Sequence, residues 1–168
     1  MRERLNYLEY AHNHNMGKKG ENLVNDAING GSLTLWTEQH DLVTADGVRL
    51  EIKFSKLHTP VKGAITMRWA WGHCLGSRNS KKYERLILIG EADLRYRTDY
   101  LDPTSPYTLF DVPFKKVKSF INSQGLINLS TNPHKVSGVS SKALFGHFAI
   151  QFSDLQDRYG IKRFKSDR

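Results

Sequence analysis

Asp41, Glu51 and Lys53 lie close together in the chain, and their side chains are those of a site that holds a divalent metal beside a phosphate. Mg²⁺ prefers hard oxygen ligands and is usually held by one or two carboxylates together with substrate phosphate. A bound metal lowers the pKa of its water and neutralises charge on the phosphorus centre. A lysine nearby can orient that water or contact the scissile phosphate.

The residues around these three predict a β-hairpin that brings them together. The run at residues 49–54 alternates apolar and polar side chains, the period-2 pattern of a half-buried strand, so Glu51 and Lys53 share a face. The Asp-Gly pair at 46–47 separates this run from residues 41–44 and is a strong hairpin signal. We therefore expect two antiparallel strands joined at this turn.

The length of the loop decides the register of the hairpin. A two-residue loop would place Asp41 and Glu51 on opposite faces. A three-residue loop, residues 45–47, places Asp41 directly across from Glu51 and Leu42 against Leu50. We favour the longer loop because it gathers the acids on one face and the apolar side chains on the other.

A helix before the hairpin contributes a further acid. Apolar residues at 23, 24, 27 and 28 follow helical spacing, and glycines at 30–31 end the helix. Glu21 lies at the edge of the buried stripe, where a carboxylate normally needs a partner. A metal, or a water on one, would be such a partner. The alternative is a first-turn glutamate favoured by the helix dipole.

This arrangement resembles the PD-(D/E)XK nuclease superfamily. The pattern of that superfamily is a helix carrying a Glu, a strand with an Asp and a strand reading Asp/Glu-x-Lys. The resemblance spans about residues 17–92 and ends with the apolar strand at residues 85–90. The matching residues are Glu21, Asp41, Glu51 and Lys53.

The sequence departs from the family pattern at one position and offers a second aspartate at another. His40 stands where the family often has a proline, a position at which the proline is commonly lost. Asp46 is a rival for the aspartate position, but it lies at the tip of the turn, so we rank it below Asp41.

The resemblance implies a restriction-endonuclease-like α/β fold, with a central mixed β-sheet flanked by helices. It also implies hydrolysis of a DNA phosphodiester with Mg²⁺, for which Mn²⁺ substitutes. Glu21, Asp41 and Glu51 are the implied metal ligands, and Lys53 completes the catalytic set.

Composition agrees with a nucleic-acid enzyme. The chain has 168 residues, enough for one domain with a substantial core, and a net charge of +8. The first 60 residues hold 7 Lys or Arg and 8 Asp or Glu, whereas residues 61–168 hold 18 and 9. A cationic field of this kind suits DNA phosphates.

We expect a single nuclease domain over residues 1–168. Its catalytic core covers about 17–92, and its basic DNA-binding elaboration covers about 93–168. Basic residues in loops and on a helix are candidates for contacts to double-stranded DNA: Arg68, Arg78, Lys81, Lys82, Lys115, Lys116 and Lys135. Trp69 and Trp71 stack on bases or belong to the core, and we favour the core.

Several features narrow the class of protein. A single cysteine, Cys74, excludes a disulfide framework and suits a reducing compartment. No apolar run is long enough for a transmembrane helix, and the charged start is unlike a signal peptide. We therefore expect a cytoplasmic protein of prokaryotic or phage type that makes no membrane contact.

Beyond the motif, the patterns predict four elements. A helix opens at Pro113 and runs to about Ser123. A polar loop covers residues 128–141, a late strand covers residues 143–152, and Ser153 caps a final short helix.

The favoured function is sequence-specific double-strand cleavage of the restriction or homing type, by a homodimer or higher homo-oligomer. Three alternatives remain open. The first is a structure-selective nuclease such as a Holliday junction resolvase. The second is a DNA-binding module on a degenerate nuclease fold, and the third is an RNA-binding protein in which the hairpin is incidental.

Overall fold

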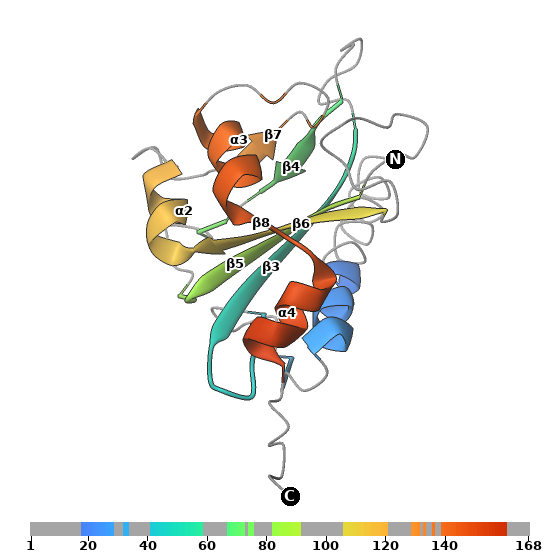
Figure 1. Cartoon of the computed structure of the whole chain (residues 1–168), viewed down its shortest axis with the longest axis vertical. Helices are drawn as coiled ribbons and strands as arrows, with labels where there is room; N and C mark the ends of the chain where they lie inside the picture. Colours follow the sequence, from blue (N-terminus) through green and yellow to red (C-terminus); the bar gives the residue numbers. More distant parts are fainter. Residues whose placement is uncertain are drawn as a thin grey trace, which may run out of the picture.

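A mixed β-sheet forms the centre of the protein (Figure 1). The computed structural model describes residues 18–28, 32–33, 41–58, 67–72, 74–75, 82–91, 106–120, 129–131, 133, 136 and 139–160. Within these residues the sheet has six strands in the order β1-β2-β3-β5-β6-β8. Their bounds are β1 Ser32–Leu33, β2 Leu42–Val43, β3 Arg49–Lys56, β5 Arg85–Glu91, β6 Tyr107–Pro113 and β8 Ala149–Ile150.

β3 and β5 form the parallel pair of this sheet, and the other neighbours are antiparallel. A parallel pair requires a crossover connection. The connection between β3 and β5 contains β4 (Trp69–Trp71), which pairs with β7 (Leu129–Thr131) in a separate two-stranded sheet. The expected α/β class, a mixed sheet flanked by helices, is thus confirmed.

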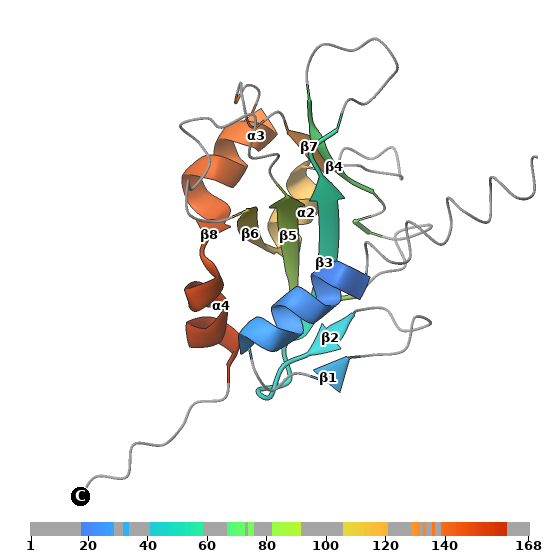
Figure 2. The same cartoon turned by 90° about the vertical axis from the view of Figure 1, so that its right-hand side faces the viewer.

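The two faces of the sheet are covered by different elements (Figures 1 and 2). The helix at residues 18–28 and α4 (Phe152–Tyr159) pack on one face. The other face is covered by β4, α2 (Phe114–Phe120) and the π-helix η2 (Leu144–Phe148), which continues α3 (Val139–Ala143). None of the helices in the described part of the chain has the length and apolarity needed to cross a membrane.

The middle of β5, residues 86–89, is apolar because both faces of the strand are buried there. Leu86 and Leu88 join the core beneath β4, whereas Ile87 and Ile89 join the core beneath the helix at residues 18–28. Gly90 follows them, and a Cβ at this position would lie 2.4 Å from the Trp69 ring. Only glycine lets the tryptophan pack this closely on the strand.

The tryptophans of β4 belong to the core, as we favoured. Trp69 and Trp71 are fully buried. The indole nitrogen of Trp71 donates to the carbonyl of Ile89 at 2.9 Å, and that of Trp69 donates to the carbonyl of Glu91 at 3.2 Å. Both polar groups are satisfied inside the protein, so neither ring is presented to a base.

Two sequence predictions for the C-terminal third are wrong in whole or in part. The predicted polar loop at 128–141 contains β7 and the start of α3. Half of the predicted strand at 143–152 is η2, and only β8, residues 149–150, is a strand. Short apolar runs fit a helix or a strand equally well. Here Leu144 is buried, and Phe148, four residues on, packs against the same core, which is helical spacing.

The helices at the two ends of this region follow the predictions more closely. α2 begins directly after Pro113, with Val117 buried. The final helix is α4, but its cap is Gln151 rather than Ser153. The backbone N–H of Gln151 donates to Asp154 at 2.7 Å in a reciprocal capping box.

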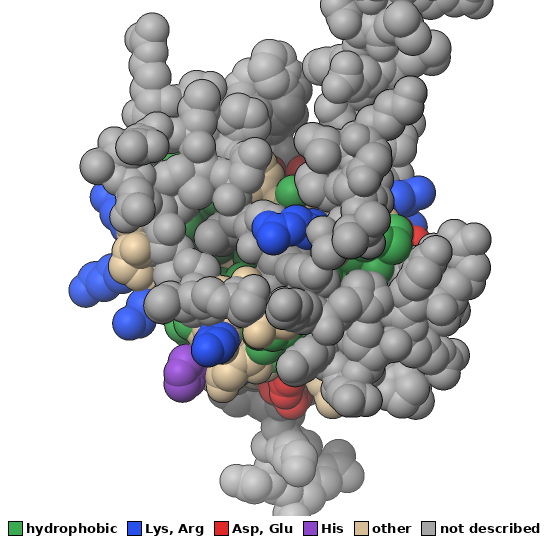
Figure 3. Space-filling model, turned by 90° about the horizontal axis from the view of Figure 1, so that it is seen from above, with side chains coloured by type: hydrophobic (Ala, Val, Ile, Leu, Met, Phe, Trp, Pro, Cys, Tyr) green, Lys and Arg blue, Asp and Glu red, His purple; other side chains and the backbone are tan. Residues whose placement is uncertain are grey.

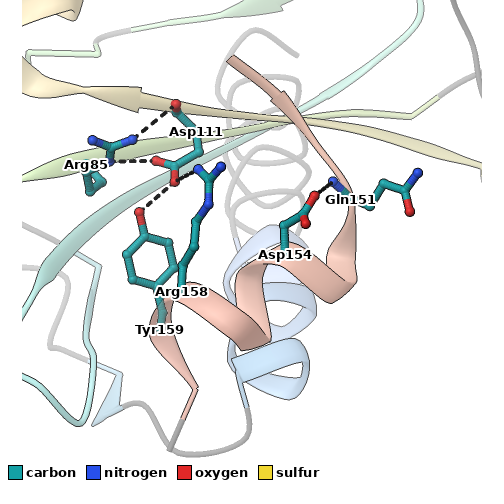
Figure 4. Close-up of polar contacts among 6 residues, drawn as sticks. All are labelled: Arg85, Asp111, Gln151, Asp154, Arg158 and Tyr159. Atoms are coloured by element: carbon teal, nitrogen blue, oxygen red, sulfur yellow. Dashed lines mark hydrogen bonds and ion pairs between the residues drawn. The ribbon is translucent and has the colours of Figure 1, made fainter. Parts of the chain in front are cut away.

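A buried carboxylate attaches α4 to the sheet (Figure 4). Asp111, on β6, is 1% exposed and accepts three hydrogen bonds. They come from Nε of Arg85 at 2.8 Å, a guanidinium nitrogen of Arg158 at 2.7 Å and the hydroxyl of Tyr159 at 2.6 Å. Burial raises the pKa of Tyr159, and its hydrogen bond to Asp111 raises it further.

Replacing Asp111 tests this attachment. Asp111→Asn removes the charge that two arginines share, so we expect the free energy of unfolding to fall by about 2–3 kcal/mol. Guanidinium unfolding curves measure the change. The matched control is Glu84→Gln, which breaks the exposed pair between Glu84 and Arg49 at 2.7 Å and should have a much smaller effect. Equal effects of the two substitutions would contradict the structural role of Asp111.

Candidate active site on the β2–β3 hairpin

The hairpin has the register that the three-residue loop predicts. Leu42 pairs with Leu50. The turn is closed by hydrogen bonds of 2.9 Å from the N–H of Thr44 to the carbonyl of Val48 and from the N–H of Gly47 to the carbonyl of Thr44. Gly47 has a φ of 81°, the left-handed conformation that the turn requires. The longer loop is therefore confirmed.

Asp41 lies against β3 at the point where β2 begins. Its N–H donates to the carbonyl of Leu50 at 2.9 Å, and its Oδ2 accepts from the N–H of Ile52 at 2.8 Å. β2 starts only at Leu42, so the carboxylate takes the place that a strand carbonyl would otherwise fill. Asp41 thus binds the backbone between Glu51 and Lys53. Asp46, in contrast, is exposed at the tip of the turn, where the sequence placed it.

Glu51 and Lys53 share the face of β3 that lies opposite the helix at residues 18–28. Nζ of Lys53 is 3.4 Å from Oε1 of Glu51, and their side chains are 24% and 1% exposed. Ser55 continues this face and accepts a hydrogen bond from the N–H of Ala70 at 3.0 Å, so β4 lies over the strand here. A phosphate approaching the pair would reach the lysine before the carboxylate.

Tyr83 lies near Glu51 and was not anticipated from the sequence. It is buried, and its hydroxyl donates to the carbonyl of Cys74 at 2.6 Å. Burial raises the pKa of Tyr83, and the negative charges of Cys74 and Glu51 raise it further. The phenol therefore stays neutral and serves as a hydrogen-bond donor inside the core.

Glu21 belongs to the helix on the other face of the sheet. This helix packs closely, because a Cβ on Gly20 would lie 3.0 Å from Cβ of Phe54 and 3.4 Å from Cγ2 of Ile52. Those side chains point away from the face of Glu51. The described residues contain no group of three or more His, Cys, Asp or Glu that could hold a metal. The role of Glu21 as a ligand stays a prediction.

Asp41 and Glu51 are the two carboxylates on which a metal site in this hairpin would depend. Asp41 accepts a hydrogen bond from the N–H that follows Glu51 along β3, and the Glu51 side chain is 1% exposed. Carboxylate oxygens are the ligand type that Mg²⁺ prefers, and one or two of them are enough when water and phosphate complete its shell. The chemistry of these side chains therefore agrees with that of a magnesium site.

The basic residues proposed to contact DNA fall into two groups. Arg68 and Lys82 are exposed on the side of β4 and at the approach to β5, and Lys115 and Lys116 are exposed on α2. The others lie outside the described residues: Arg78, Lys81 and Lys135.

Asp111 is a buried polar residue that the sequence could have indicated. It stands alone in the apolar run at residues 109–112, where an acid must find a partner. For Tyr83 no local signal exists, because its neighbours in space come from distant segments.

The sequence matches no protein-family model, and a search of curated proteins finds no match either.

Asp41 has a structural role that can be separated from a catalytic one. Asp41→Ala leaves the N–H of Ile52 without its acceptor, so we expect a loss of about 1–3 kcal/mol in the free energy of unfolding. Asp41→Asn keeps an acceptor oxygen and should unfold close to wild type. Asp46→Asn is the control, since Asn-Gly turns as well as Asp-Gly. Urea unfolding compares the three, and an unchanged Asp41→Ala would show that the bond to Ile52 is unimportant.

Proposed function

We propose that this protein is an Mg²⁺-dependent DNA endonuclease with a restriction-endonuclease-like core. The observation that carries the proposal is the pairing of Glu51 and Lys53 at 3.4 Å on one face of β3, with Asp41 bound to the same segment. The order of elements supports it, because a helix, the β1–β2–β3 strands and a β5 parallel to β3 follow one another along the chain.

Each residue of the site has a distinct role in this proposal. Asp41 and Glu51 would hold Mg²⁺, or Mn²⁺ in its place, whereas Glu21 lies on the helix that covers the opposite face of the sheet. The bound ion would supply a water of lowered pKa and neutralise charge on the phosphate. Lys53 is the more exposed member of the pair, so its ammonium meets the scissile phosphate and stabilises the charge that grows on it.

The substrate that we propose is double-stranded DNA. The net charge of +8 suits a polyanion, and the excess of cations lies beyond the hairpin. Cleavage of both strands by a chain with one site requires two copies related by symmetry, so we propose a homodimer. Sequence-specific cutting of the restriction or homing type is favoured over junction resolution because of the basic material outside the hairpin.

A non-cleaving DNA-binding module is the second candidate. Glu51 is 1% exposed, and Asp41 is hydrogen-bonded to the backbone of β3, so both carboxylates serve the fold whether or not they hold a metal. This candidate predicts DNA binding that Mg²⁺ does not convert into cleavage.

Incubation with a supercoiled plasmid separates these functions. We expect discrete linear fragments with Mg²⁺ and intact plasmid with EDTA, read on an agarose gel. Glu51→Gln keeps the shape of the side chain but removes its charge, so it should bind the plasmid without cutting it. Nicked circles alone would contradict the dimer. An intact plasmid with Mg²⁺ and Mn²⁺ would reject the nuclease in favour of the binding module.

Lys53 gives the quantitative test. A donor that stabilises transition-state charge contributes about 3–4 kcal/mol, so Lys53→Ala should lower the single-turnover cleavage rate by about two to three powers of ten. Affinity measured with Ca²⁺ should change little. Lys53→Arg should not restore the full rate, because the planar guanidinium does not replace a compact point charge. Lys56→Ala, two residues beyond the site and exposed, is the matched control.

A further inference from the structure

A long stretch of the chain contains no acid. Between Asp111 and Asp154, residues 112–153 hold five lysines, two histidines and no aspartate or glutamate. The whole chain has 17 acidic residues in 168, so a stretch of this length would carry about four at the average frequency. This segment is therefore more strongly basic than the net charge of the whole chain indicates.

The fold places two helical parts of this segment on one core. Val117 of α2 and Leu144 of η2 are buried in the cluster that contains the tryptophans of β4. Phe114, Phe145 and Phe148 pack against the same cluster. The inner sides of α2 and of α3–η2 are thus occupied, and their polar residues face outward.

The outward side chains form what we call the basic surface: Lys115, Lys116, Lys118, Lys142 and His147, all exposed. In Figure 3, Lys and Arg side chains project from the edge on which α2 lies in Figure 1, and a histidine is visible beside them. No described acidic side chain is visible on that edge. The basic surface spans two elements that are distant in the sequence.

Several cations elsewhere in the described chain are paired with acids. Lys19 pairs with Glu91 at 3.5 Å, Arg49 with Glu84 at 2.7 Å, and Arg158 with Asp111 at 2.7 Å.

The lysines of the basic surface differ from these cations. Among the described residues, no carboxylate lies within ion-pair distance of Lys115, Lys116, Lys118 or Lys142. Lys118 instead lies over the ring of Phe114, with its ammonium 5.0 Å from the ring centre. Like charges held near one another repel, and a bound polyanion would offset that repulsion.

The basic surface also begins close to the proposed active site. The N–H of Phe114, the first residue of α2, donates to the carbonyl of Glu84 at 3.1 Å, and the N–H of Glu84 donates to the carbonyl of Arg49 at 2.9 Å. One residue therefore joins the start of α2 to the start of β3, the strand that carries Glu51 and Lys53.

We propose that the basic surface binds the phosphate backbone of duplex DNA, independently of base sequence. Duplex DNA carries about one charge per 1.7 Å of its axis, the kind of continuous charge that two lysine-bearing elements can follow. The exposed cations here are lysines rather than arginines, which suits contact with phosphate more than bidentate reading of a base. The inference rests on the proposed function in that this DNA is the substrate of the hairpin.

Salt-dependent binding tests the proposal without cleavage. The affinity of the wild-type protein for a fluorescent duplex is measured by anisotropy in EDTA at several KCl concentrations. The variant Lys116→Gln/Lys142→Gln removes one lysine from each element of the basic surface. The control Lys18→Gln/Lys56→Gln removes two exposed lysines elsewhere, so the two variants have the same net charge.

The slope of log affinity against log salt gives the outcome. Each lost phosphate contact reduces its magnitude by about 0.9, so the variant of the basic surface should lose about 1.8, equally on duplexes of unrelated sequence. The control should keep a slope close to that of wild type. Equal losses in the two variants, or binding of duplex RNA but not of DNA, would overturn the proposal, as would no binding to either.

The two proposals fail separately in these assays. If the variant of the basic surface loses the expected slope but Mg²⁺ leaves the plasmid uncut, the basic surface is supported and the nuclease is rejected. A cut plasmid together with equal slopes in both variants rejects the basic surface and leaves the nuclease standing.

Discussion

The burial of β3 between two layers is the constraint on which the rest of the structure depends. The strand carries apolar side chains to one face, whereas Glu51 and Lys53 lie on the other, under β4. A buried ion pair gives little net stability, because the cost of desolvating both charges offsets their attraction. Lys53 is 24% exposed, so the desolvation cost falls mainly on the Glu51 carboxylate. The proposed chemical role of the pair would account for that cost.

Two buried carboxylates in the same sheet are held in different ways. Asp111 accepts three hydrogen bonds of 2.6–2.8 Å from two arginines and a tyrosine, and these bonds tie α4 to β6. Glu51 pairs with Lys53 at 3.4 Å, which is longer than a charge-assisted hydrogen bond. The short contacts of Asp111 suit a structural carboxylate. Glu51, in the segment of β3 that Asp41 binds, is the carboxylate that we propose as a metal ligand.

The hairpin part of the chain and the part that carries the basic surface differ in charge. The part that forms the hairpin has nearly equal numbers of acids and bases, whereas residues 112–153 contain bases only. Glu84 joins the two parts, because its N–H donates to the carbonyl of Arg49 at 2.9 Å and its carbonyl accepts from the N–H of Phe114 at 3.1 Å. A carboxylate site that must meet a polyanion faces electrostatic repulsion, and an adjacent cationic surface offsets it. In this proposal, the basic surface offsets the repulsion between DNA and the carboxylates of the site.

The sequence by itself determined the elements that local chemistry specifies. Alternation of side chains predicted β3, and apolar continuity predicted β5. The Asp-Gly turn predicted the hairpin, and the separation of acids from apolar side chains favoured its register. Each of these signals depends only on neighbours along the chain. The tertiary structure alone decided what those neighbours could not. Pairing with β4 made β7 a strand, packing on the core made residues 144–148 a π-helix, and the short β2 turned the Asp41 carboxylate toward the N–H of Ile52. Burial of Glu51 beside Tyr83 and the opposite placement of the helix with Glu21 likewise arise from contacts between distant segments, which a pattern of spacing does not encode.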